Sequence, residues 1–347
     1  MGLILTAFES NQDLWVHLVN TVLPIYVVNT LLLFLGVLTL AGGLGISTAW
    51  IVTYYSFFGK KVIEWALILP LACPAYIIAY VYTDFLEYAG PVQGLIRHIF
   101  GFNSAADYYF PEIRSVMGAI FVMGFVLYPY VYILARTGFK NSPRSLYETA
   151  RLYGRNKFLA VGLPLCRPYI AAGLALVAME VLSDFGTVEY FSVQTLTLGM
   201  FNVWIGMNSI SAASQIAIVT FVFIIILLVL ERKARSSQKY NDTSKRLNNV
   251  SPTKLSIRKS VFAIGFCLVP ILIGFITSGY FFSYINFSDN NEILSIPSKI
   301  GVELLLFSIG LKVKPSSFLS LSFLNVFFLH SLLITPVSYT HLRAHET

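Results

Sequence analysis

Three carboxylates within one apolar stretch are the residues of this sequence best suited to chemistry. Glu180, Asp184 and Glu189 lie within residues 169–191. If that stretch is one helix, Glu180 and Asp184 are four residues apart and share a face. An ionisable group inside a membrane costs about 3 kcal/mol or more unless it faces water or a partner. A solute path and a hydrogen-bonded helix pair both explain these residues. Carboxylates suit trivalent iron, but with no histidine beside them we expect no bound metal.

A second polar group occupies the loop 137–168, which reads TGFKNSPRSLYETARLYGRNKFLAVGLPLCRP. Ser142 or Ser145 can cap a helix at its start, and Gly154 can end it with a positive φ. Pro164 and Pro168 should then stop any helix before the next apolar stretch. The pattern predicts a short amphipathic surface helix that presents Glu148 and the small Ala150 to a partner, flanked by Arg144, Arg151, Arg155 and Lys157.

The composition shows what must position these residues. Of the 347 residues, 56% are hydrophobic and 12% are charged, with a mean hydropathy of +0.71. Soluble domains carry about 25% charged residues. Because a membrane-spanning helix needs about 20 apolar residues, we predict an all-α polytopic membrane protein with about six spans. Five spans are clear and a sixth follows them, at residues 25–55, 64–84, 116–136, 169–191, 208–230 and 261–282.

The basic residues indicate which loops face the cytoplasm. Seven Lys and Arg residues fall in 136–168 and nine in 231–260, whereas 1–24 and 192–207 contain none. Cytoplasmic loops carry the excess of positive charge. The net charge of +7 is therefore explained by topology and lipid headgroups, and we expect no nucleic-acid partner.

Several catalytic motifs are absent from the sequence. There is no Gly-x-x-x-x-Gly-Lys-Ser/Thr to bind ATP phosphates, no Gly-x-Ser-x-Gly and no His-Glu-x-x-His. We therefore expect a chain that is not an enzyme, and any ATP hydrolysis that drives it must occur on a separate subunit.

The loop resembles a known family at this point. Glu148-Thr149-Ala150 followed by Gly154 resembles the EAA loop of ABC importer permeases, with Thr149 in place of an alanine, and Leu163-Pro164 resembles its closing Leu-Pro. The resemblance implies that Glu148, Thr149, Ala150, Gly154 and Pro164 couple the chain to a cytoplasmic ATPase subunit.

Further segments are similar to the ferric-iron branch of these permeases, namely 64–93, VLYPYVYILAR at 126–136 and MEVLSDFGTVEYF at 179–191. The resemblance implies a type-1 ABC importer transmembrane helix bundle in the inner (plasma) membrane, passing the membrane several times. It implies a permease subunit for ferric iron, with thiamine or another small solute as the alternative. Implied partners are ATP-binding ABC subunits, a periplasmic substrate-binding protein, a second permease half and the lipid bilayer. ATP and Mg are implied on the ATPase, and no cofactor on this chain.

The chain divides into segments of different character. We predict a non-cytoplasmic N-terminal segment at 1–24, a transmembrane core at 25–235, a basic cytoplasmic linker at 236–260 and the start of an incomplete second half at 261–297. Residues 298–336 are a doubtful segment that fits a chimeric join, and 337–347 resembles translated sequencing-adapter text, an artefact tail. For that reason the i, i+4 pair His341 and His345 is not read as a metal site.

Two other classes of function stay open. Residues 298–318 resemble part of a cation/proton antiporter, which would also use intramembrane carboxylates such as Glu180 and Asp184. The patterned loop 142–168 argues against this alternative. A membrane scaffold would explain the composition but neither the loop nor the carboxylates.

Overall fold

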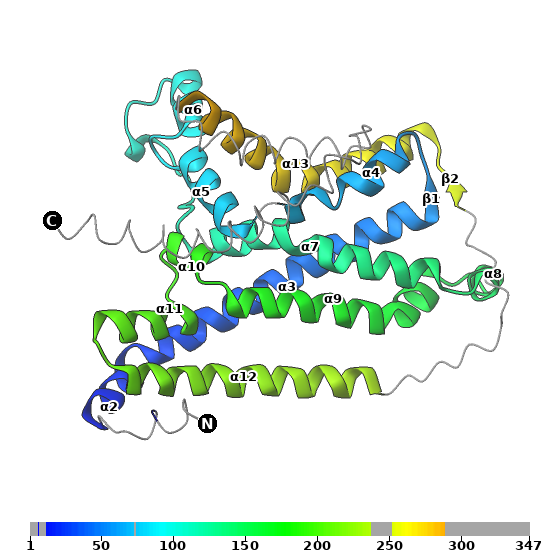
Figure 1. Cartoon of the computed structure of the whole chain (residues 1–347). Helices are drawn as coiled ribbons and strands as arrows, with labels where there is room; N and C mark the ends of the chain where they lie inside the picture. The colour runs from blue at the N-terminus through cyan, green and yellow to red at the C-terminus, as the bar shows by residue number, and fades with distance from the viewer. Residues whose placement is uncertain (1–5, 7–11, 73, 237–251, 289–347) are drawn as a thin grey trace, which may run out of the picture. The chain divides into compact units, whose positions relative to one another are not determined.

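The fold is known from a computed structural model, which describes residues 12–72, 74–236 and 252–288, together with Thr6 (Figure 1). The predicted segments 298–336 and 337–347, with His341 and His345, lie outside these residues. In chain order the elements are α2 (Gln12–Thr21), α3 (Leu23–Tyr54), β1 (Tyr55–Ser56), α4 (Lys60–Ala66), η1 (Leu69–Ala72), α5 (Ala75–Leu86), α6 (Pro91–Phe100), η2 (Ala105–Asp107), α7 (Val116–Lys140), α8 (Arg144–Leu152), η3 (Phe158–Gly162), α9 (Leu163–Ser183), α10 (Gly186–Tyr190), α11 (Leu196–Phe201), η4 (Asn202–Gly206), α12 (Ile210–Ser236), β2 (Thr253–Lys254) and α13 (Ile257–Ser288).

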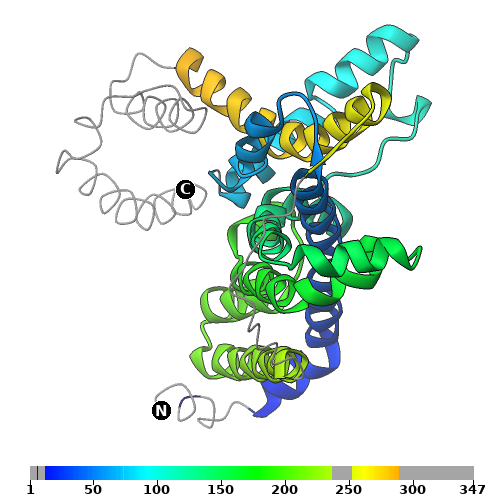
Figure 2. The ribbon, with the colours of Figure 1, turned by 90° about the vertical axis from the view of Figure 1, so that its right-hand side faces the viewer.

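The predicted all-α membrane fold is confirmed. Within the described residues, four helices are long and apolar enough to cross a membrane: α3, α7, the η3–α9 run and α13 up to Gly274. A fifth span is possible if the bent run from α4 to α6 counts as one, and α12 contributes a shorter apolar stretch, Ile210–Ile226. Figure 2 views the molecule from the side on which α8 lies and shows α7, α9 and α12 close to end-on.

The span predicted at 64–84 is not one continuous helix. It is broken into α4, the 3-10 turn η1 and α5, and the two parts of the run are bent by 90°. Pro74 stands at the N-cap of α5 in an extended conformation, and proline cannot donate the backbone hydrogen bond that a continuous helix requires. Hydropathy identified this apolar segment but not its break.

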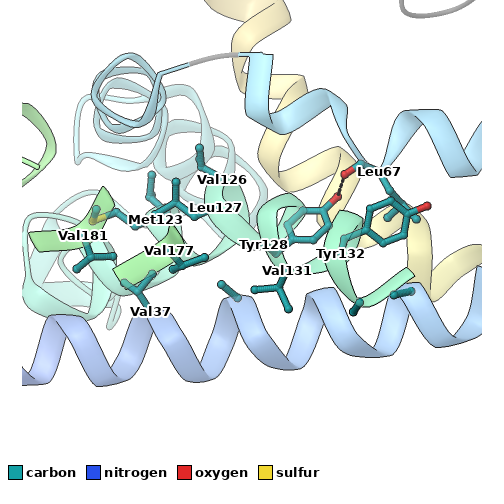
Figure 3. Packing of buried hydrophobic residues seen from close by; sticks show 14 of the residues in the cluster. Val37, Leu67, Met123, Val126, Leu127, Tyr128, Val131, Tyr132, Val177 and Val181 are labelled. Atoms are coloured by element: carbon teal, nitrogen blue, oxygen red, sulfur yellow. Dashed lines mark hydrogen bonds between the residues drawn. The ribbon is translucent and has the colours of Figure 1, made fainter. Parts of the chain in front are cut away.

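Helix α7 satisfies polar groups that this break exposes. Leu71 N–H bonds to Ile68 O, so Leu67 O accepts instead from the Tyr128 hydroxyl at 2.8 Å (Figure 3). One turn further along α7, the Tyr132 hydroxyl donates to Glu64 O at 3.1 Å. An unsatisfied carbonyl in lipid costs several kcal/mol, so these two tyrosines allow the broken span to exist inside a membrane.

Helix α7 is the centre of the bundle, and it packs mainly against α3 and α9. Both neighbours approach it through a glycine at the level of Val131. A Cβ on Gly45 of α3 would lie 2.7 Å from Val131 Cβ, and a Cβ on Gly173 of α9 would lie 2.8 Å from Val131 Cα. Helix α3 thus approaches α7 closely at Gly45, whereas Gly43 has nothing within 4 Å of such a Cβ.

The predicted sixth span is α13, which packs against η1, α5 and α7. The Tyr82 hydroxyl on α5 donates to Ile273 O on α13. Strand β2, within the predicted basic linker, pairs in parallel with β1 through Tyr55 and Thr253. Helix α13 is therefore held to the first part of the chain; its place in a second half stays a prediction.

Replacing Gly45 by alanine tests the packing around α7. Because the added Cβ would also lie 2.9 Å from Tyr128 O, α3 and α7 must move apart, and we expect a loss of about 1–3 kcal/mol in stability. The measurement is the thermal unfolding of the purified protein in detergent. Gly43→Ala is the control, since its methyl group would enter open space; equal unfolding temperatures for both variants would contradict this packing.

Candidate functional site

The loop 137–168 contains the predicted surface helix, which is α8 (Arg144–Leu152). The predicted serine cap is wrong. Pro143 occupies the N-cap and makes no side-chain cap bond, while the Ser142 hydroxyl donates backward to Gly138 O at 2.9 Å. Ser142 is used at the end of α7 because free carbonyls are available there and the residue before a proline is disfavoured in a helix.

The predicted end of α8 at Gly154 is confirmed. Gly154 has φ +62°, its N–H bonds to Arg151 O at 3.1 Å, and the next N–H, of Arg155, returns to Ala150 O at 2.9 Å. These two bonds form a Schellman motif, which needs a left-handed residue at this position. Glycine reaches that conformation without steric cost.

The two faces of α8 differ from the expectation in one respect. Tyr147 and Ala150 are buried within the chain, so Ala150 is not available to a partner. Its small side chain instead lets the helix lie close to the bundle. The outer face is charged: Glu148 is exposed and pairs with Arg144, Nε to Oε1 at 2.7 Å, one turn earlier. Glu148 lies in the second turn of α8.

An aromatic cluster holds the buried face of α8, and we call it the aromatic seat. It consists of Tyr147 of α8, Trp50 and Tyr54 of α3, Phe139 of α7 and Phe158 of η3. The Tyr147 ring meets that of Tyr54 at 4.8 Å between centroids, and Trp50 stacks on Tyr54 at 3.8 Å. Trp50 also meets Phe139 at 5.3 Å and Phe158 at 5.0 Å, both edge to face.

The aromatic seat connects α8 to three long helices at one point. Burial raises the pKa of the Tyr147 phenol above its usual range, so this ring stays neutral. Gly162 at the start of α9 leaves room for the indole, since a Cβ there would lie 2.6 Å from Trp50. Sequence reasoning missed this cluster. Its available signal was the i, i+4 pair Trp50 and Tyr54 at the end of a span.

The π-helical turn η3 follows α8 and is capped by Asn156. The Asn156 Oδ1 accepts from the N–H groups of Phe158 at 2.9 Å and Leu159 at 3.4 Å.

The prolines after α8 do not behave as predicted. Pro164 stands in the first turn of α9, where its missing N–H is tolerated, and Pro168 lies inside α9 without ending it. The span therefore begins before residue 169, as a direct continuation of the α8 loop.

The three carboxylates are not aligned on one helix as predicted. Helix α9 ends at Ser183, and Asp184 is extended, with ψ 130°. Its Oδ1 accepts from Thr187 N–H at 3.0 Å and Val188 N–H at 3.1 Å, and its Oδ2 accepts from the Thr187 hydroxyl at 2.9 Å. From the position before the N-cap Phe185, the Asp184 side chain thus caps the first turn of α10. An aspartate side chain can hydrogen-bond to the backbone N–H groups of residues that follow it, and this local bonding competes with a helical conformation of the aspartate itself.

Glu180 and Glu189 are both exposed, but on different helices, α9 and α10. Glu180 accepts a hydrogen bond from the Tyr130 hydroxyl at 3.3 Å. It borders an apolar groove of about 600 Å³ between α3, α9 and α12, lined by residues such as Phe34, Leu174, Met179 and Ile224. Within the described part of the chain, no three His, Cys, Asp or Glu residues converge on a metal site.

Comparisons with known proteins identify relatives of this chain. The chain is 25% identical over 227 residues to the Fe(3+)-transport system permease protein FbpB 2 of Haemophilus influenzae, covering 64% of this chain and 40% of that protein. It is 25% identical over 207 residues to the putative molybdenum transport system permease protein YvgM of Bacillus subtilis, covering 56% of this chain and 84% of that protein. The match thus spans less than half the length of the ferric-iron relative.

A third relative is the molybdenum transport system permease protein ModB of Haemophilus influenzae, 27% identical over 168 residues, or 46% of this chain and 70% of that protein. Among solved structures, a bacterial ABC transporter involved in the import of the acidic polysaccharide alginate shares the fold with a TM-score of 0.52. It is 19% identical and covers 67% of this chain and 87% of its own. A family profile matches residues 41–244, which include α7, α8, α9 and all of α12. The chain belongs to the family of binding-protein-dependent transport system inner membrane components.

Proposed function

We propose that this chain is a permease subunit of an ATP-driven importer and that α8 transmits the motion of a separate ATPase to the spans. The observation that carries the proposal is the two-faced contact of α8. Its outer face exposes Glu148 and Thr149, while Tyr147 on its inner face is packed into the aromatic seat. A partner that pulls on the outer face must therefore move α3, α7 and α9 together.

The spans transmit this motion because they are tightly packed. Gly45 and Gly173 bring α3 and α9 against Val131 of α7 with no space for an added methyl group, and such interiors behave as rigid bodies. Helix α9 leads from η3, beside α8, to its end at Ser183, where Asp184 starts α10. A tilt that begins at α8 thus reaches Glu180 and α10 at the opposite end.

We further propose ferric iron as the cargo. Of the three relatives described above, one is named for Fe(3+) transport and two for molybdenum transport. The acidic side chains favour the cation, since Glu180 and Glu189 are exposed at the far end of α9 and on α10. Carboxylates attract a hard cation and repel an oxyanion such as molybdate or sulfate.

The alternative class of function is less well supported. An antiporter mechanism would leave the exposed charged face of α8 without a role.

The coupling role of α8 predicts a loss of function in Glu148→Lys. The exposed pair with Arg144 contributes only about 0.2–1 kcal/mol, so the variant should fold and insert. We expect it to lose most ATP-driven uptake and to bind the ATPase subunit more weakly, measured by co-purification and by uptake in proteoliposomes that contain the ATPase and binding protein. Glu112→Lys, the same change in an exposed loop before α7, is the control. Full ATP-driven uptake by Glu148→Lys would contradict the coupling role of α8.

The conformation of Gly154 gives an independent test of the same helix. At φ +62° a valine costs roughly 1–2 kcal/mol, whereas asparagine tolerates this region. Because nothing lies within 4 Å of an added Cβ, the effect is purely conformational. We expect Gly154→Val to weaken ATPase co-purification and Gly154→Asn to resemble the wild type. Identical behaviour of both variants would show that the Schellman motif does not orient α8.

The proposed cargo and path predict how the carboxylates behave. Proteoliposomes supplied with each solute in turn should take up radiolabelled ferric iron in preference to molybdate or sulfate. Glu180→Gln should lower the iron rate several-fold while ATPase association and thermal stability stay unchanged, because its side chain is exposed.

Asp184 serves as the structural comparison. Asp184→Ala should lower stability by about 1 kcal/mol through loss of the α10 cap, and Asp184→Asn should restore most of it.

Two outcomes of the uptake experiment would contradict the proposed cargo or path. Preferred uptake of an oxyanion would reject ferric iron but leave the coupling role of α8 standing. Normal iron uptake by Glu180→Gln would remove this residue from the path.

A further inference from the structure

Helix α6 is amphipathic in the reverse of the usual sense. Gln93 on one side is buried and Arg97 is half-buried, whereas Leu95, Ile99 and Phe100 on other sides are 60%, 64% and 67% exposed. A surface helix of a soluble protein normally turns its apolar stripe toward the core. Here the polar side faces the protein and the apolar side faces outward.

Hydrogen bonds fix this orientation. Gln93 Nε2 donates to Leu86 O at 2.8 Å, and Gln93 Oε1 accepts from the Tyr108 hydroxyl at 2.6 Å. Arg97 Nη1 donates to the same hydroxyl at 3.0 Å, and its guanidinium lies 4.1 Å from the centre of the Tyr88 ring. Rotating α6 to hide its apolar side would break all of these contacts.

The position of α6 indicates what covers the apolar side. It begins at Pro91, with four residues between it and the end of α5 at Leu86, and lies at the end of the bundle opposite α8 (Figure 1). With 10 residues it is about 15 Å long, too short to cross a membrane. Helix α7 begins at the same end with apolar residues that are also exposed, Met117 and Phe121.

Aromatic residues gather around the end of α6. Phe100 stacks on Phe102 at 5.9 Å between ring centroids, Phe102 stacks on Tyr108 at 5.2 Å, and Tyr109 is 91% exposed. Aromatic side chains are enriched where the hydrocarbon core of a membrane meets water. The apolar side of α6 thus continues the lipid-facing surface of the spans at the level of the headgroups.

We propose that α6 is an interfacial anchor, which lies in the outer leaflet with Leu95, Ile99 and Phe100 among the lipid chains. Amphipathic helices bind in this way by placing their apolar face at the boundary between headgroups and acyl chains. The anchor sets the depth of the loop 101–115 above the membrane. The proposal does not rest on the cargo or on the ATPase.

Spin labels measure this placement directly. In the full chain with its native cysteines replaced by alanine, reconstituted in phosphatidylcholine vesicles, a label at Ile99→Cys should collide several-fold more often with oxygen, which dissolves in lipid, than with a water-soluble nickel chelate. A label at Asn103→Cys, which is exposed two residues after Gly101, should show the reverse preference.

A second measurement avoids the cysteine replacements. Because the chain has four native tryptophans, the emission added by Ile99→Trp is measured as the difference from the parent chain. That added emission should be quenched by brominated lipid chains and shielded from acrylamide, relative to the emission added by Asn103→Trp. Access of the nickel chelate or acrylamide to position 99 overturns the proposal. So does protection from both oxygen and the chelate, because that result would mean that protein covers this face.

Discussion

The contact between Tyr147 and Tyr54 is the interaction on which the arrangement of the cytoplasmic end depends. Helix α8 has nine residues, and helices of that length are marginal in water. The aromatic seat keeps it formed by burying Tyr147 and Ala150, and the same rings join α3, α7 and η3. In the proposed function, the buried face carries the mechanical connection to the spans, and the exposed face is left for recognition of the partner.

The middle of the bundle extends this constraint. Val131 of α7 is enclosed by Gly45 and Gly173, while Tyr128 and Tyr132 on the same helix reach across to the broken span. One helix therefore supplies both the close packing on α3 and α9 and the polar partners of the α4–η1 segment. Because α7 makes both sets of contacts, a substitution that moves this helix disturbs its packing on α3 and α9 and its hydrogen bonds to the α4–η1 segment at once.

The sequence predicted those features that depend on local patterns. Hydropathy identified α3 and α7 as spans. Gly154 identified the end of α8, because the left-handed residue that ends a helix is usually a glycine. Sequence reasoning failed where a distant partner decides the outcome. The break at Pro74 persists because α7 supplies hydroxyl groups, Asp184 leaves α9 for a cap, and the burial of Ala150 follows from the aromatic seat. The predicted segments after residue 288 lie outside the described chain.

The hydrogen bond between Tyr82 and Ile273 joins residues 191 positions apart. Ribosomes add about 5–20 residues per second, so roughly 10–40 s pass between the synthesis of the two partners. During that time the Tyr82 hydroxyl lacks this acceptor, and η1 and α5 lack their packing partner α13. Among the described residues, the broken span thus gains part of its polar and packing partners only after a helix far later in the chain has been made.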